Sequence, residues 1–139
     1  MRILQLCKKF PYPLKDGESI AVTALSRSLH KLGCKVSLLA MNTHKHYFPL
    51  EKLPEGFNHY EEICTAQVDN RLKPGKALLD LWCNRSYHIS RFISEDYERE
   101  LRQLLKRKTF DIIQLETPYL APYIPCIRRH SNAAISMRA

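Results

Sequence analysis

Two short loops of this chain carry the side chains whose types and spacing suit binding or catalysis. The first loop holds Asp16, Gly17 and Ser19 at the start of an amphipathic segment, and the second holds Glu116 and Tyr119 after an apolar run. A glycine before a helix lets the backbone approach a ligand, and the free N–H groups of the first helical turn can bind an anion. A carboxylate at a strand end can accept hydrogen bonds from ligand hydroxyls or orient a reacting group. A turn glycine and an ordinary polar strand end remain the structural alternatives for Gly17 and Glu116.

Other chemistry-bearing patterns are missing from the sequence. The first loop contains a single glycine, so it matches neither G-x-G-x-x-G nor a Walker A loop, and we expect no dinucleotide cofactor. His44 and His46 have no third ligand nearby, and the five cysteines are scattered without a C-x-x-C pair. We therefore expect neither a metal site nor a disulfide framework. Free thiols among apolar residues are typical of a reducing cytoplasm.

The elements that must position the two loops are predicted by apolar periodicity. Alternating strands and helices predict an α/β domain with a doubly wound, Rossmann-like parallel sheet of order 3-2-1-4-5. Ligands bind such sheets beyond the carboxyl ends of the strands, where the strand order reverses. That point lies between the first and fourth strands, so the two loops should meet there. We expect strands at residues 2–7, 35–41, 57–68, 111–116 and 133–138, and helices at 18–32, 76–84, 94–108 and 119–130.

Residues that start and stop helices support these boundaries. Asp16 or Ser19 can cap the first helix, Gly33 stands where a C′ glycine belongs, and Ser94 can cap the third helix. The acidic start and basic end of that third helix complement its dipole. The apolar positions that recur at roughly helical spacing in the first helix are Ile20, Val22, Ala24, Leu25, Leu29 and Leu32.

The net charge of the chain indicates which kinds of binding partner it favours. The 139 residues carry 22 basic and 14 acidic side chains, a formal net charge of +8. Such an excess favours a phosphorylated substrate or an anionic membrane surface, although solvated helix ends and loops are the simpler explanation. No recognition helix, zinc finger or RNA-binding aromatic pattern accompanies it, so no nucleic-acid partner is expected. No apolar run suits a signal peptide or a membrane helix, which predicts a cytoplasmic protein with at most peripheral contact to the inner membrane surface.

Four passages of the chain resemble the N-terminal domain of bacterial GT-B-fold glycosyltransferases of the retaining, mannosyltransferase-like group. They are Arg2–Pro13 with Asp16-Gly17, Leu29–Leu39, Phe110–Glu116 and Ser136–Ala139. The resemblance implies that residues 1–139 form the acceptor-side Rossmann-like domain of a two-domain enzyme. The donor-binding domain and the catalytic residues would then lie outside this chain, and the fragment alone would be inactive.

The same resemblance implies an activity and its partners. The enzyme would transfer a hexose from a nucleotide sugar, its co-substrate, to a glycan or lipid-linked acceptor in polysaccharide biosynthesis, without a cofactor. Asp16, Gly17 and Ser19 would approach the donor diphosphate and the acceptor, and Glu116 and Tyr119 would line the acceptor side. A freestanding Rossmann-like or flavodoxin-like module that binds a small anion at the Gly17 loop is the alternative.

Overall fold

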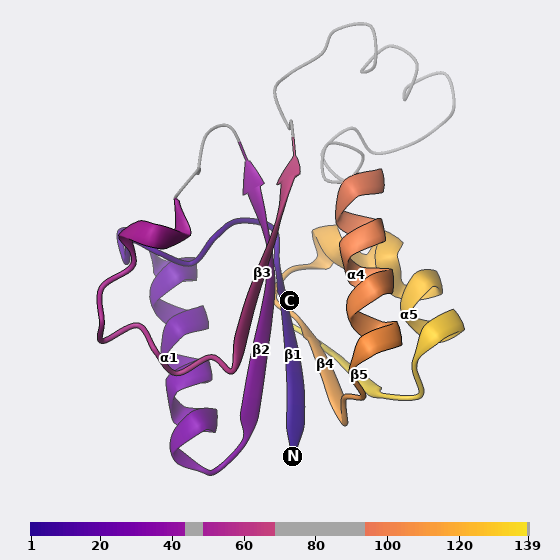
Figure 1. Cartoon of the computed structure of the whole chain (residues 1–139), viewed down its shortest axis with the longest axis horizontal. Coiled ribbons are helices and arrows are strands. Elements are labelled where there is room, and N and C mark those ends of the chain that lie inside the picture. The colour runs from indigo at the N-terminus through magenta and orange to yellow at the C-terminus, as the bar shows by residue number, and fades with distance from the viewer. Residues whose placement is uncertain (44–48, 69–93, 139) are drawn as a thin grey trace, which may run out of the picture.

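The computed structural model describes residues 1–43, 49–68 and 94–138 of the chain. Its strands are β1 (Arg2–Cys7), β2 (Lys35–Thr43), β3 (Glu62–Val68), β4 (Ile112–Leu115) and β5 (Ala134–Met137). They form one parallel sheet in the order β3-β2-β1-β4-β5, which confirms the predicted doubly wound, Rossmann-like α/β class. The central β1 pairs with β2 on one side and β4 on the other, so the carboxyl ends of β1 and β4 mark the switch point (Figure 1).

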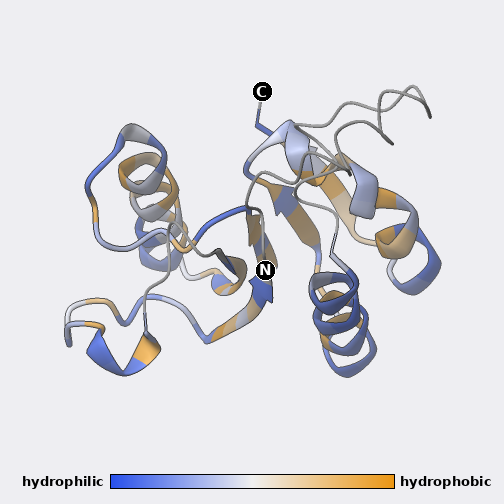
Figure 2. Ribbon diagram, turned by 90° about the horizontal axis from the view of Figure 1, so that it is seen from above, coloured by the Kyte–Doolittle hydropathy of each residue, from blue (hydrophilic) through white to orange (hydrophobic). Residues whose placement is uncertain are grey.

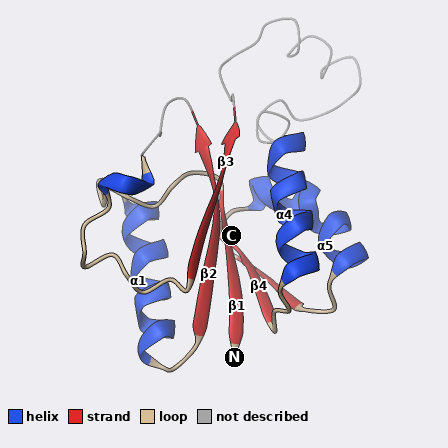
Figure 3. Cartoon of the chain, in the orientation of Figure 1, coloured by secondary structure: helices blue, strands red, loops and turns tan. Residues whose placement is uncertain are grey.

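Helices cover both faces of this sheet (Figure 1, Figure 3). The helix α1 (Gly17–Lys31) lies on one face, and α4 (Glu95–Arg107) and α5 (Ile124–His130) lie on the other. Two 3-10 helices, η1 (Leu50–Lys52) and η2 (Pro118–Tyr123), stand in the connections. None of the helices in the described part of the chain is long and apolar enough to cross a bilayer.

The helix predicted over residues 119–130 is divided in two. The 3-10 helix η2 occupies its first half, and α5 begins at Ile124. Pro122 and Pro125 lack the backbone N–H that a continuous α-helix would need, which explains the break. The helix predicted over residues 76–84 and the pair His44 and His46 lie outside the described residues.

The predicted helix caps are present. The Asp16 side chain accepts a hydrogen bond from the backbone N–H of Ser19 at the start of α1, and the Ser94 side chain accepts one from Tyr97 at the start of α4. Leu32 caps the end of α1, and Gly33 follows with a φ of 89°. This left-handed conformation favours glycine and turns the chain into β2.

The face of the sheet under α4 and α5 is packed by apolar residues. Tyr97, Leu101 and Leu104 of α4 are fully buried against the strands, and the Tyr97 hydroxyl donates to the backbone oxygen of Leu39 at 2.9 Å. Figure 2 shows the apolar residues of the strands lying between the two helix layers. This apolar core fixes the strands whose carboxyl ends form the switch point.

The buried side of α1 differs from the apolar face expected from its sequence. The buried residues of this helix are Ser19, Val22, Thr23 and Ser26. Ile20 and Leu32, which the periodicity places on the apolar face, are 52% and 79% exposed. The Thr23 hydroxyl donates to the backbone oxygen of Pro11 at 3.4 Å, and the Ser26 hydroxyl donates to that of Thr23 at 3.0 Å. Polar groups therefore share the space between α1 and the sheet with apolar ones.

Candidate functional site

A cavity of about 250 Å³ opens at the carboxyl ends of β1 and β4, where the strand order predicts a ligand site. We call it the switch-point cavity. The residues that line it are Lys8, Glu18, Ala21, Val22, Glu116, Thr117, Pro118 and Arg138. Two basic and two acidic side chains therefore meet at one small opening, together with the start of η2.

Glu116 is the most buried charged group of this cavity, and its side chain has no exposed surface. Its Oε1 accepts a hydrogen bond from Gln5 Nε2 at 2.7 Å, and its Oε2 lies 2.8 Å from Arg138 Nε. The backbone is also fixed, because Glu116 N donates to the oxygen of Leu6 and Arg138 N donates to that of Leu115. Oε1 thus has a hydrogen-bond partner, while Oε2 accepts no hydrogen bond from the described residues and is balanced by the charge of the Arg138 guanidinium.

Arg138 and Lys8 are the cations that line the switch-point cavity. The Arg138 side chain is 39% exposed and uses Nε for Glu116, and its Nη groups form no hydrogen bond or ion pair with another described residue. A guanidinium has five N–H donors in a planar fork, so this arrangement leaves donors for a second oxyanion. Lys8 Nζ lies 3.9 Å from Glu18 Oε2 and 4.9 Å from the ring centroid of Tyr119.

The first loop predicted to bind a ligand is occupied by its own side chains. Asp16 Oδ1 accepts from Ser19 N at 2.8 Å, and Asp16 Oδ2 forms an ion pair with Lys9. The bond from Lys9, followed by that from the Ser19 N–H, lowers the pKa of Asp16 to about 2. Space is open at Gly17, where an added Cβ would meet nothing within 4 Å. None of these residues lines the switch-point cavity.

The second predicted loop contributes more directly. Glu116 lines the cavity, and Tyr119 lies under Lys8 beside it. Thr117, at the start of η2, is buried, and its hydroxyl accepts from Tyr119 N at 3.4 Å. Of the five residues predicted for the site, the structure thus brings Glu116 and Tyr119 to this cavity and keeps the other three at the cap of α1.

Three side chains of the group around Glu116 were not predicted as site residues: Gln5 and Arg138, which contact Glu116, and Tyr60, which donates to Gln5. Gln5 and Tyr60 lie in the core, and Arg138 follows the last strand. A signal for Arg138 was available, because Leu115 is in register with Met137, and the next residues are Glu116 and Arg138. Strand order, once carried into register between the fourth and fifth predicted strands, therefore implied that these two residues meet.

A buried polar layer extends from Glu116 under α1; we define it as Gln5, Ser26, His59, Tyr60 and Glu116. The Tyr60 hydroxyl donates to Gln5 Oε1 at 2.6 Å, and burial raises the pKa of Tyr60. His59 is 3% exposed, and its Nε2 lies 2.7 Å from Ser26 Oγ. Burial, with a smaller effect of nearby Arg27, lowers the pKa of His59 to about 4, so the ring is neutral near pH 7.

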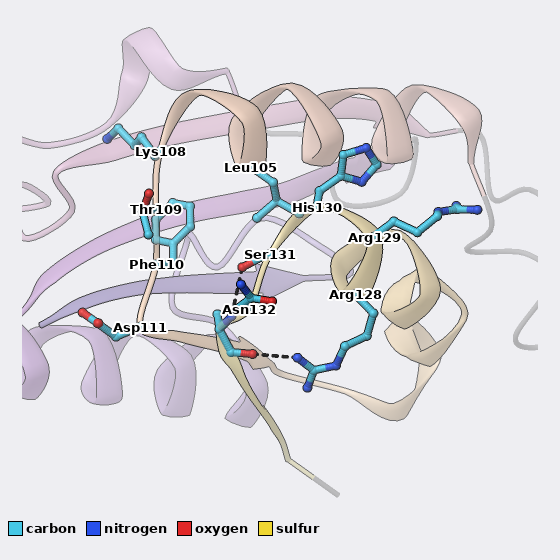
Figure 4. A pocket seen from close by; sticks show the side chains of 11 residues that line it. Leu105, Lys108, Thr109, Phe110, Asp111, Arg128, Arg129, His130, Ser131 and Asn132 are labelled. Carbon is cyan, nitrogen blue, oxygen red and sulfur yellow. Dashed lines mark hydrogen bonds between the residues drawn. The ribbon is translucent and has the colours of Figure 1, made fainter.

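A second cavity, of about 540 Å³, lies at the opposite edge of the sheet (Figure 4). Its basic side chains already have partners within the fold. Arg128 Nη1 donates to the backbone oxygen of Ala133 at 2.8 Å, and Lys108 Nζ lies 2.8 Å from Glu62 Oε2. Lys108 and Arg128 stand near the ends of α4 and α5, where cations offset the helix dipoles. We therefore attribute this basic cluster to the fold.

The described residues contain no group of three or more histidine, cysteine or acidic side chains that could hold a metal ion. Cys7 lies close to Glu116 at the end of β1, but burial, and next the charge of Glu116, raise the pKa of its thiol. A buried thiol with a raised pKa is a poor nucleophile. The arrangement therefore suits binding by charge and hydrogen bonding.

No family model and no curated protein matches this chain. A solved structure, the C-terminal domain of PF1911 hydrogenase from Pyrococcus furiosus, is similar, with a TM-score of 0.62 and 14% sequence identity. The match covers 99% of this chain and 90% of that one. At this identity the likeness shows a shared Rossmann-like fold.

The prediction of a mannosyltransferase-like GT-B glycosyltransferase is wrong. The solved structure matched along nearly the whole chain is a hydrogenase domain, and no family model supports a glycosyltransferase. The passages that carried the resemblance, such as Leu29–Leu39, consist of a helix end, a C′ glycine and a buried strand. Any βαβ unit needs these features, so they indicate the fold and not hexosyl transfer.

Proposed function

We propose that this chain is a Rossmann-like module that binds a small ligand through an oxyanion, a phosphate or a carboxylate, at the switch-point cavity. The observation that carries the proposal is Arg138, which the buried Glu116 holds at the cavity. A carboxylate that engages Nε orients the guanidinium and leaves its Nη groups for a second anion. Lys8 supplies a second positive charge at the same opening.

The size of the cavity limits the ligand. A volume of about 250 Å³ corresponds to roughly eight water molecules, at about 30 Å³ for each in the liquid. The space between the described residues accepts one oxyanion and a few further atoms. The absence of a G-x-G-x-x-G loop in the sequence agrees with that limit.

The acidic residues of the cavity set the strength of binding. Glu18 Oε2 lies 3.9 Å from Lys8 Nζ and 3.5 Å from Lys9 Nζ, so an incoming anion must compete with it for Lys8. We therefore expect weak affinity for a bare anion such as inorganic phosphate. A ligand that also donates a hydrogen bond to Glu18 would bind more tightly.

The test is a titration of the protein with inorganic phosphate, and separately with acetate, followed by amide chemical shifts in NMR spectra. We expect saturable shifts of resonances around the switch-point cavity. Arg138→Gln removes charge-assisted hydrogen bonds and should weaken binding about 10- to 100-fold, while Arg138→Lys, which keeps the charge without the fork, should weaken it less. Arg128→Gln is the matched control in the opposite cavity.

Two results would contradict the proposal. One is the absence of saturable shifts with both anions. The other is an equal loss of affinity in Arg138→Gln and Arg128→Gln, because this would indicate a general effect of net charge.

A further inference from the structure

We propose that Tyr60 and Gln5 are positioning residues for the switch-point cavity and act on its ligand through Glu116 and Arg138. This inference rests on the proposed function. The Tyr60 hydroxyl donates to Gln5 Oε1 at 2.6 Å, and Gln5 Nε2 donates to Glu116 Oε1 at 2.7 Å. Glu116 Oε2 then lies 2.8 Å from Arg138 Nε. We call this chain of four side chains the relay.

The direction of the hydrogen bonds fixes the Gln5 amide. A protonated phenol donates to Oε1, so the amide nitrogen must face Glu116, and it also donates to the backbone oxygen of Val22 at 3.3 Å. The opposite orientation would place the amide oxygen against the carboxylate. Burial raises the pKa of Tyr60, which keeps the phenol protonated and the orientation set. Glu116 is therefore held in one rotamer, and Arg138 with it.

Stability of the fold alone does not require an amide, a phenol and a carboxylate at the positions of Gln5, Tyr60 and Glu116. Every other residue of β1 between Ile3 and Cys7 is apolar, and Gln5 is 1% exposed at its centre. An apolar side chain would fill such a position without the cost of burying an amide, a phenol and a carboxylate. One bond of the relay joins Tyr60 to Gln5, which are 55 positions apart in the sequence, and the next joins Gln5 to Glu116, which are 111 positions apart. The relay therefore links the segment before β3, the central strand and the cavity.

The first variant is Tyr60→Phe, which removes one hydroxyl and frees the Gln5 amide to turn. We expect the dissociation constant for inorganic phosphate to rise about three- to tenfold, the effect of one hydrogen bond. The NMR signal of the Arg138 Nε–H should also exchange faster with water. Tyr97→Phe is the matched control, because it removes a buried hydroxyl that bonds Leu39 on the other face of the sheet. It should lower stability and leave the phosphate affinity unchanged.

A double-mutant cycle separates positioning from general destabilisation. In the Arg138→Lys background, Tyr60→Phe should no longer change the phosphate affinity, because the guanidinium that the relay orients is gone. Equal losses in both backgrounds, or no loss from Tyr60→Phe, would overturn the relay. Gln5→Leu breaks the relay at its centre and serves as the second variant if Tyr60→Phe does not fold.

The same measurements keep the two proposals apart. If the unchanged protein shows no saturable phosphate binding, the proposed function fails. If it binds phosphate and depends on Arg138, but Tyr60→Phe and Gln5→Leu bind as tightly as the unchanged protein, only the relay fails.

Discussion

Acidification should destabilise this fold through His59 before any carboxylate contributes. His59 belongs to the segment before β3, contacts Ser26 of α1 and is 3% exposed. Its ring lies 4.9 Å from that of Phe57 and 4.3 Å from that of Tyr60, and its Nδ1 has no hydrogen-bond partner among the described residues. Protonation would place a charge among these rings, with a hydrogen bond to Ser26 but near the positive charge of Arg27. Burial first, and Arg27 next, therefore lower the pKa of His59.

The direction and the size of the change in stability follow from the pKa values of His59 in the folded and unfolded states. The pKa of His59 is about 4 in the folded state against 6.5 for an unperturbed histidine, so the unfolded chain binds more protons between these values. Stability is complete above pH 6.5 and falls as the pH approaches 4. A difference of about 2.5 pKa units corresponds to a loss of about 3 kcal/mol at the acidic limit. Asp16 and Glu62, whose pKa values are both about 2, add their losses mainly below pH 4.5.

The assay is urea unfolding between pH 4.5 and 7.5, with the free energy of unfolding plotted against pH. His59→Gln keeps a polar group near Ser26 but cannot titrate, so its stability should vary little between pH 5 and 6.5. His130→Gln, on α5 at the other face of the sheet, is the control and should keep the slope of the unchanged protein. If His59→Gln retains the full slope, burial of this ring does not cause the loss of stability at acidic pH.

Three further predictions concern the first loop and α1. Glu18→Gln removes the carboxylate that competes for Lys8 and should tighten phosphate binding several-fold in the NMR titration; weaker binding would contradict the assignment of the cavity. Asp16→Ala should cost about 1 kcal/mol in thermal unfolding through loss of the α1 cap, whereas Asp16→Asn, which still caps, should cost less; equal losses would contradict the cap. Gly33→Ala should destabilise by about 1 kcal/mol because φ is 89°, while Gly17→Ala, in open space and with no positive φ, should be neutral or stabilising; the reverse order would contradict the backbone assignment.

The fold was predictable because its signals are local. Apolar runs specify the strands, and residues such as Ser94 and Gly33 mark helix ends within a few positions. Right-handed connections then place consecutive strands side by side, except that the chain crosses from the edge strand β3 to the far side of β1 to form β4. The buried side of α1 was not predictable in this way, because the hydroxyl groups of Thr23 and Ser26 find partners outside the helix, in Pro11 and His59.

In the candidate site, too, some residues could be predicted from local sequence signals and others depend on contacts between distant segments. Glu116 could be predicted because it ends a strand at the switch point, and Asp16 could be predicted as a cap candidate. Arg138 required the further step of carrying strand order into register, where it falls beside Glu116. Asp16 caps α1, since its Oδ1 accepts from the Ser19 N–H, and its part in ligand binding stays a prediction.

Gln5 carries a strong sequence signal for the candidate site. It interrupts an otherwise apolar interior strand, and a buried amide must find hydrogen-bond partners or destabilise the fold. Its position at the centre of β1 restricts those partners to groups that pack against this strand, and the structure supplies Tyr60 from the segment before β3, Glu116 from beside β4 and Val22 from α1. A polar residue inside a central parallel strand therefore points to the functional end of the sheet more specifically than the glycine and strand motifs that every Rossmann-like domain shares.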